Sequence, residues 1–261
     1  MVRALLIRGM LVGILAGLLV FAFGKVVGEP QVDRAISFES ALDAAKAKAD
    51  AARGLPVVGE PELVSRSVQA GLGLFTGVMV YSAAFGGLFA LVFAVADRRV
   101  IDLDPRASAA LLAVAGFIAV YVVPNLKYPA SPPSVGQPDT IGQRTTLYFI
   151  MLALSVGAMV VAAVARKRLA TRLGGWNAAL VAVGGYLVVV IVASGVLPSV
   201  NEVPDAFPAV VLWQFRLASF GMQLIMWATI GLVFGAVTER MLAGRGNRVL
   251  NGSRRNPGAA I

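Results

Sequence analysis

The sequence predicts an all-α integral membrane protein with about six transmembrane helices. Of its 261 residues, 58% are hydrophobic and only 14% are charged, and the mean hydropathy is +0.79. No water-soluble domain of this length needs so much apolar side chain. A helix needs roughly 20 apolar residues to cross the hydrocarbon core. Six stretches approach that length, and we expect them to form one membrane domain over residues 1–240: 9–27, 68–96, 107–123, 145–165, 177–197 and 217–237.

The first stretch is expected to be a retained helix. Arg3 and Arg8 precede it, as in a signal peptide, but the apolar run is longer than usual and no Ala-x-Ala-like site follows. Glycines spaced four residues apart recur in three spans, and close approach through small residues stabilises helix pairs in lipid. They predict close helix contacts for spans one, two and six, at Gly9/Gly13/Gly17, Gly73/Gly77 and Gly231/Gly235.

The connection after the first span is about forty residues long and opens with GEPQVDRAISFE at Gly28–Glu39. Pro30 suits the first turn of a new helix, so we expect the chain to turn there into a partly helical outer connection. Glu29 and Asp33 are four residues apart and therefore share a helical face. A second Gly-Glu-Pro start at residues 59–61 echoes the first.

The distribution of the +9 net charge predicts the topology. Lys and Arg gather at the N-terminus, in the second and fourth connections and in the tail, whereas residues 198–208 have none. Cytoplasmic loops collect Lys and Arg, so both termini should be cytoplasmic and connections one, three and five should lie outside a multi-pass protein of the plasma membrane. The basic tail, 241–261, is expected to be disordered and to meet the lipid bilayer rather than nucleic acid.

The third and fifth connections share a pattern. Each leaves the membrane through a proline, carries an asparagine (Asn125 or Asn201), and contains Pro-Asp (Asp139 or Asp205). Each then enters the next span through an arginine, as the first connection does. The chain is therefore also compatible with three helical hairpins in one orientation.

The residue types exclude much catalytic chemistry. The chain has no His and no Cys, which excludes thiol chemistry, imidazole metal ligands and His-based triads. It has no Gly-x-x-x-x-Gly-Lys-[Ser/Thr] motif. No Asp or Glu lies inside a predicted span, so the usual carboxylate proton relay is missing. We expect neither an enzyme nor a resident cofactor.

The candidate functional residues lie in the outer connections. An arginine near a span and against the positive-inside bias indicates a functional site with a partner. The candidate ion-pairing or gating residues are Arg66, Arg144, Arg216, Asn125 and Asn201, and the candidate metal ligands are Glu29, Asp33, Asp139, Glu202 and Asp205. We expect the empty carboxylates to be held by Arg144 and Arg216. A purely structural cluster of salt bridges fits the same residues equally well.

Four segments carry a family resemblance: GEPQVDRAISFE, ELVSRSVQAGLG, VPNLKYPASPPSVGQPDTIGQRT and LPSVNEVPDAFPAVVLWQFRLASFGMQ. They resemble the CbtA family of proposed cobalt transporter subunits, from the first span to the last. The resemblance implies a membrane permease subunit that transports cobalt and is associated with cobalamin metabolism. It also implies a partner, the small one-span CbtB protein with a histidine-rich tail. The sequence leaves a homo-oligomer open.

This chain departs from the family in one respect: members often carry histidines in the first outer connection, and this chain has none. Cobalt(II) prefers imidazole and tolerates carboxylate, so metal selectivity is expected to come from the partner. The favoured function is a transport subunit whose acidic outer links concentrate a divalent cation. The alternatives are a membrane scaffold, and a transporter of an anionic or chelated substrate bound by Arg144 and Arg216.

Overall fold

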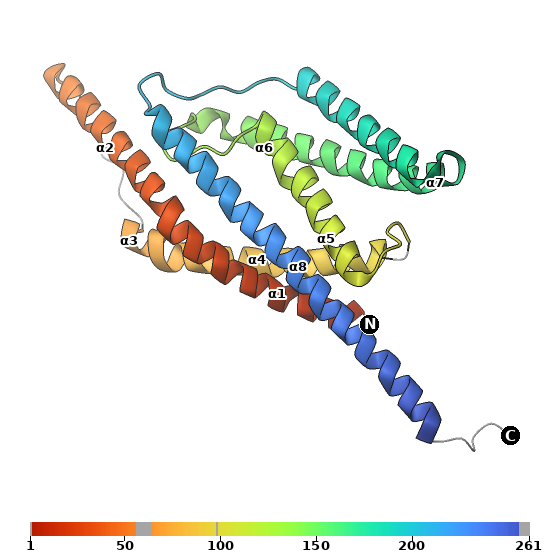
Figure 1. The fold of residues 1–261 in the computed structure, drawn as a ribbon. Coiled ribbons are helices and arrows are strands. Elements are labelled where there is room, and N and C mark those ends of the chain that lie inside the picture. The colour runs from red at the N-terminus through yellow and green to blue at the C-terminus, as the bar shows by residue number, and fades with distance from the viewer. Residues whose placement is uncertain (1, 56–63, 98, 256–261) are drawn as a thin grey trace.

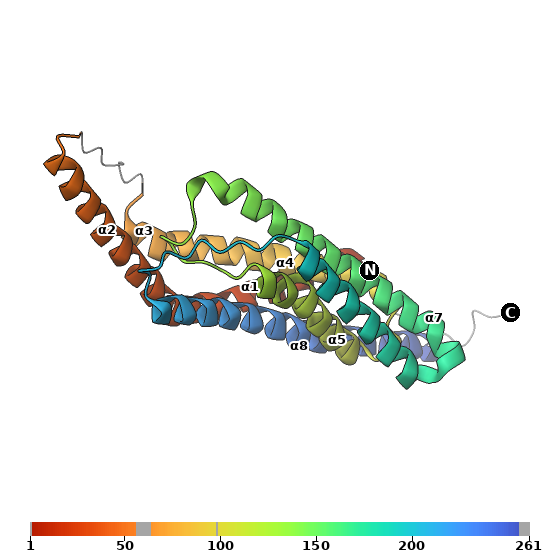
Figure 2. The same ribbon diagram turned by 90° about the horizontal axis from the view of Figure 1, so that it is seen from above.

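The computed structural model describes residues 2–55, 64–97 and 99–255, with side chains as far as Met241. Regular structure in these ranges is helical, apart from one bridge between Asp97 and Ile101. Five helices are long and apolar enough to cross a membrane: Val2–Ala52, Arg66–Ala96, Pro105–Lys127, Pro138–Val196 and Ala209–Met241. Figures 1 and 2 show them as an elongated bundle with one helical hairpin at its side.

The first helix is longer than its predicted span and does not turn where we expected. It comprises α1 (Val2–Phe23), the π-helical turn η1 (Gly24–Gly28) and α2 (Glu29–Ala52). Gly28 has right-handed helical angles, φ −80° and ψ −52°, so the predicted turn is wrong. Pro30 has no amide hydrogen and therefore cannot donate a helical hydrogen bond. It lies two residues after the end of the wide π turn η1, whose different hydrogen-bond register lets the helix continue past the missing donor.

The next two helices are also interrupted by π turns. The second comprises α3 (Arg66–Val68), η2 (Gln69–Gly73) and α4 (Leu74–Ala96), and the third comprises α5 (Pro105–Gly116), η3 (Phe117–Val122) and α6 (Val123–Lys127). The second Gly-Glu-Pro start, at residues 59–61, lies outside the described residues. The third helix begins where Asp104 accepts a hydrogen bond of 2.9 Å from the amide of Ala107, which is a side-chain N-cap.

The predicted fourth and fifth spans lie in one element. After a short 3₁₀ turn, η4 (Pro138–Thr140), α7 runs from Ile141 to Val196 and reverses at Gly174, where φ is 75°. Positive φ is easily adopted only by glycine. The two arms, 141–173 and 175–196, run back along each other (Figure 2), and Ser155 and Tyr186 share a hydrogen bond of 2.9 Å between them. We call this element the α7 hairpin.

The last helix, α8, runs from Ala209 to Arg255. The segment 241–261, expected to be disordered, is therefore helical as far as Arg255, and residues 256–261 lie outside the described part.

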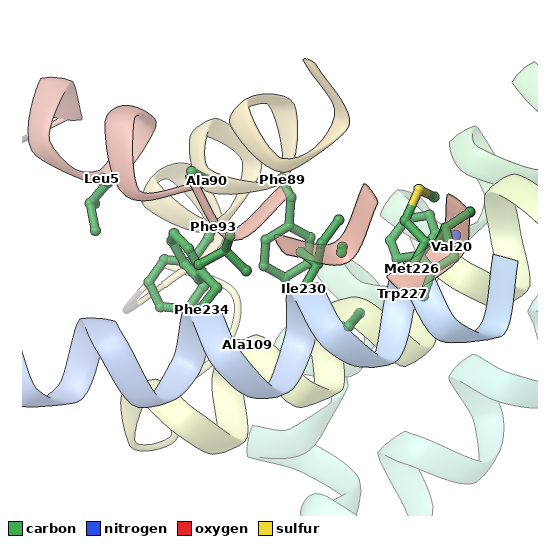
Figure 3. Packing of buried hydrophobic residues seen from close by; sticks show 13 residues of the cluster. Leu5, Val20, Phe89, Ala90, Phe93, Ala109, Met226, Trp227, Ile230 and Phe234 are labelled. Carbon is green, nitrogen blue, oxygen red and sulfur yellow. The ribbon is translucent and has the colours of Figure 1, made fainter. Parts of the chain in front are cut away.

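The main core lies between α1, α4, α5 and α8 (Figure 3). A Cβ atom on Gly9 would lie 2.3 Å from the carbonyl oxygen of Gly86, and one on Gly13 would lie 2.2 Å from that of Ser82. The predicted close contact of the first span is therefore confirmed. Rings of α4 and α8 complete the core, as where Phe89 and Phe234 meet edge to face at 5.5 Å.

The glycine prediction is confirmed for span six and wrong for span two. Gly231 and Gly235 pack against Ala113 and Ala109 of α5. A Cβ atom on Gly77, in contrast, would meet nothing within 4 Å. The backbone of α4 meets α1 one and two turns further along, because the crossing point is set by the whole helix face rather than by one pair of glycines.

Connections one, three and five meet at one end of the bundle, which we call the linker end (residues 25–38, 64–70, 124–144 and 197–216). There Lys127 donates to the hydroxyl of Ser199 at 3.0 Å and Tyr128 donates to the carbonyl of Pro198 at 2.8 Å. At the opposite end, which we call the basic end, Lys167 donates to the carbonyl of Arg99. The Lys/Arg distribution predicted this alternation, whereas the side of the membrane that each end faces stays a prediction.

Candidate functional site

The first group of candidate residues joins α2 to the start of α3. Glu29 and Asp33 lie one turn apart on α2, and both carboxylates bind the guanidinium of Arg66. The Nε of Arg66 donates to Asp33 Oδ1 at 3.0 Å. The side chain of Glu29 is 11% exposed and that of Asp33 is 60% exposed. The contact of Arg66 with Glu29 therefore lies largely inside the protein, whereas its contact with Asp33 is open to solvent.

A second contact lies one turn below this ion pair. Lys25, in η1, donates to the carbonyl oxygen of Ala70, in η2, at 2.9 Å. A π turn shifts the backbone hydrogen-bond register and leaves a carbonyl available to another donor. Sequence reasoning did not select Lys25. Its signal was a lysine four residues before Glu29, at the end of an otherwise apolar run.

The second group surrounds Glu202, in the connection before α8. Its carboxylate accepts hydrogen bonds of 2.8 Å from the hydroxyl of Thr140 and from the amide of Gln137, and Arg144 Nε lies 3.4 Å away. The hydrogen bond from Thr140, then that from Gln137 and the charge of Arg144, lower the pKa of Glu202. Two hydrogen-bond donors and the nearby charge of one guanidinium thus hold this side chain as a carboxylate.

A glycine makes the position of Arg144 possible. Gly136 has a φ of 113°, and a Cβ atom there would lie 2.2 Å from Arg144 Nη1. The guanidinium therefore packs against bare backbone, and it also donates to the carbonyl of Gln137 at 3.2 Å. Neither Gly136 nor Gln137 was singled out from the sequence, because their role depends on a loop conformation.

The third group is centred on Arg216, and here the expectation was wrong. Arg216 binds no carboxylate of the described chain; its Nε donates to the carbonyl oxygen of Ala130 at 3.2 Å. Asn125 accepts from the amide of the same residue at 3.1 Å. The guanidinium is half-buried within the first turns of α8, where a backbone carbonyl reaches it, whereas the carboxylate of Glu202 is already held by Arg144.

The three groups are connected by residues 128–137, which we call the strap. It is anchored at Ala130 by Asn125 and Arg216, and at Gln137 by Glu202 and Arg144. Between them Ser134, with a φ of 67°, donates to the carbonyl of Ala35 on α2 at 3.3 Å. A non-glycine residue in that region is held there by its surroundings. The strap thus ties α2, α6, α7 and α8 together.

The remaining candidates do not join these groups. Asp139, Asn201 and Asp205 are exposed, and no hydrogen bond or ion pair connects them to another residue of the described chain. Within the described ranges, no three acidic side chains lie close enough to hold a metal ion. The five candidate ligands are thus distributed over the linker end rather than assembled at one point, and metal binding by them stays a prediction.

Comparison with known families identifies the chain. A family model described as "Probable cobalt transporter subunit (CbtA)" matches residues 2–239, which include all the groups described above. No curated protein and no solved structure gave a match. The long apolar helices agree with a membrane transporter family. The chain belongs to the CbtA family of probable cobalt transporter subunits.

Proposed function

We propose that this protein is the permease subunit for a divalent transition-metal cation, and that it takes up cobalt for cobalamin metabolism through six spans in the plasma membrane. The family description supports cobalt as the transported substrate. The six spans are the two arms of the α7 hairpin and the four other long helices. The linker end is the entrance.

The observation that carries the proposal is the charge balance of the linker end. Arg66 holds Glu29 and Asp33, and Arg144 holds Glu202. The guanidinium groups here pair with carboxylates. A divalent cation that has lost part of its water shell binds a carboxylate more strongly than a guanidinium does. A cation that arrives displaces an arginine, and the carboxylates raise its local concentration at the entrance.

The ligand chemistry of the chain calls for a partner. Without His or Cys, it offers carboxylate, carbonyl, amide and thioether groups. Met226 is buried in the main core and Met222 packs against Gly24, so these thioethers serve packing. Because cobalt(II) prefers imidazole, we propose that a small one-span CbtB-like protein with a His-rich tail delivers the metal.

Cobalt uptake by a double carboxylate variant tests the proposal. Glu202→Gln with Asp205→Asn removes two charges at the entrance, and we expect uptake at low cobalt concentration to fall about tenfold, which corresponds to about 1.4 kcal/mol of binding free energy. The matched control is Asp43→Asn with Asp50→Asn, on the outer part of α2, which should retain uptake. Wild-type uptake in the first variant, at equal expression, would contradict a cation entrance.

Arg216 supports one alternative, the transport of an anionic or chelated substrate. It is half-buried and has a carbonyl rather than a carboxylate as its partner, so its charge is not neutralised by an adjacent anion. That function predicts that loss of Glu202 and Asp205 is tolerated, whereas Arg216→Ala and Arg144→Ala abolish transport. A scaffold predicts that neither pair of changes alters uptake.

Cysteine labelling tests the topology. Cysteines at Ala47, Val135 and Val203 should react from outside the cell, whereas cysteines at Asp102 and Arg168 should be protected until the membrane is opened. External labelling at Arg168 would contradict the six-span arrangement, because this residue lies next to the reversal of the α7 hairpin.

A further inference from the structure

The two arms of the α7 hairpin enclose an apolar groove that no side chain fills. Its volume is about 560 Å³, within the range of roughly 300–1,000 Å³ that is typical of ligand sites. Gly157 lines it from the first arm and Gly185 from the second, and a Cβ atom at either position would meet nothing within 4 Å. The groove is therefore open space between two helices that touch elsewhere.

The groove runs to the basic end of the bundle. Its lining on the first arm includes Val161, Ala165 and Leu169, and the helical period continues this stripe through positions 168 and 172. Both positions are arginines, both are exposed, and neither has an ion-pair partner in the described chain. The apolar groove thus ends at two arginines that have no ion-pair partner in the described chain.

A tryptophan marks the depth of this end in the membrane. Trp176, just after the reversal at Gly174, is 77% exposed. Exposed tryptophans gather at the level of the lipid headgroups. The groove therefore extends from the headgroup level into the hydrocarbon, with the two arginines at its polar mouth.

We propose that the α7 hairpin binds one anionic phospholipid, with an acyl chain in the groove and the phosphate bound by Arg168 and Arg172. Basic sites between helices at one membrane face select anionic headgroups. The two arginines favour an anionic lipid over a transmembrane helix as the occupant, because an apolar helix offers the guanidinium groups no anion. The lipid would pack between arms that have little other packing. This inference does not depend on the transported substrate.

The headgroup arm of the test is a native mass spectrometry titration of the full chain in mild detergent with dioleoyl phosphatidylglycerol. Each arginine near the surface contributes about fivefold in affinity, so Arg168→Gln with Arg172→Gln should weaken binding on the order of 25-fold. The control, Arg3→Gln with Arg240→Gln, removes the same charge from exposed positions elsewhere on the chain and should change binding less than about twofold. Equal affinity for dioleoyl phosphatidylcholine in the wild type, or equal binding by the two double variants, would overturn the proposal.

The acyl-chain arm uses glycine substitutions. Gly157→Leu places a side chain in the groove and should abolish phosphatidylglycerol binding without loss of folding, because the position is open. Gly184→Leu is the control: it is equally open but does not line the groove. If Gly157→Leu retains the lipid, or alters the oligomeric state while the lipid stays bound, the groove belongs to another occupant and the proposal is wrong. Excess inorganic phosphate should not displace the lipid; displacement would contradict the acyl-chain contact.

Discussion

The contact of α1 with α4 and the α7 hairpin are both antiparallel helix pairs in one bundle, yet they are packed differently. In the first pair, backbones touch at Gly9, Gly13 and Gly86, where a Cβ atom does not fit. In the second, glycines at the interface face open space. In the most apolar stretch of the first helix 39% of the residues are buried, whereas in the most apolar stretch of α7 only 17% are buried.

The difference indicates where the bundle is held together. Lipid gives no hydrophobic drive between helices, so close backbone contact has to supply the attraction. The α1–α4 pair has that close contact, and α8 packs against both helices with aromatic rings such as Trp227 and Phe234. The α7 hairpin contacts α6 through a small cluster, and the strap and Glu202 tie its first arm to the rest. The hairpin is thus attached mainly at the linker end.

The largest expected effect comes from breaking the tight pair. Gly13→Leu forces the α1 and α4 backbones apart, and overpacking of this kind costs about 3 kcal/mol or more. Gly157→Leu makes the same chemical change in the hairpin, where nothing is displaced. Thermal unfolding of the detergent-solubilised variants should show a large loss for Gly13→Leu only. Similar melting temperatures would remove the distinction between the two pairs.

The next effect concerns the strap that connects the two regions. Arg216→Ala removes the donor to Ala130, and a hydrogen bond from a charged group contributes about 2 kcal/mol. A cysteine at Val135 in the strap should then be labelled several-fold faster, and uptake should be lost. Arg216→Lys keeps the charge but not the planar guanidinium, so it should be folded, with an intermediate labelling rate and impaired uptake. Arg53→Ala, an exposed change directly after the end of α2, should match the wild type.

Acidification should loosen the same strap. Because hydrogen bonds from Thr140 and Gln137 lower the pKa of Glu202 in the folded state, its stabilising contribution is complete above the unfolded pKa of about 4.3 and is lost as the pH falls through the lower folded value. Relative to a cysteine at Ala47, which corrects for the loss of thiolate at low pH, labelling at Val135 should therefore rise as the pH falls below the unfolded pKa.

The pH step should depend on Glu202 alone among nearby acids. Glu202→Gln should show faster labelling at neutral pH and no further step on acidification. Glu39→Gln, an exposed change on α2, should keep the wild-type profile. An unaltered acid step in the Glu202 variant would assign the step to another group.

The smallest effect is expected inside the hairpin. Tyr186→Phe removes the buried hydrogen bond to Ser155 that joins its arms, and such bonds average about 0.6 kcal/mol in membranes. Limited proteolysis near Gly174 should become slightly faster, with the unfolding of the main core unchanged. Ser37→Ala, which removes a hydroxyl bonded to its own helix, should have no effect on that cleavage. A shift in core melting with Tyr186→Phe would show that the hairpin is coupled to the core more strongly than its packing indicates.

Different parts of the fold and the site were predictable to different degrees. The apolar runs placed all six predicted spans inside helices, apart from Leu197 at the end of the fifth, because the length needed to cross lipid is a local property of the chain. The helix ends were less predictable: Pro30 indicated a turn, but the π turn before it lets the helix continue. Gly9 and Gly13 were correctly placed at a close contact, but the partner glycine was not Gly77.

The candidate site likewise has features that the sequence predicted and features that it did not. The pairing of Glu29 and Asp33 on one face follows from their spacing, and an acidic–basic match at the linker end follows from the composition of alternate connections. The partner of Arg216 did not follow, since its acceptor is a backbone carbonyl that any residue type could supply.

By itself, the sequence indicated that lipid rather than water surrounds the helices. It also determined the number of apolar runs, the residue types available to a cation, and the family. These depend on side-chain chemistry and on periods of a few residues. The tertiary structure alone decided which helices meet backbone to backbone, that the strap joins Asn125, Arg144 and Arg216, and that a groove remains open beside Gly157. Those features depend on backbone atoms, which every residue carries alike, and on the crossing points of helices that are far apart in the chain.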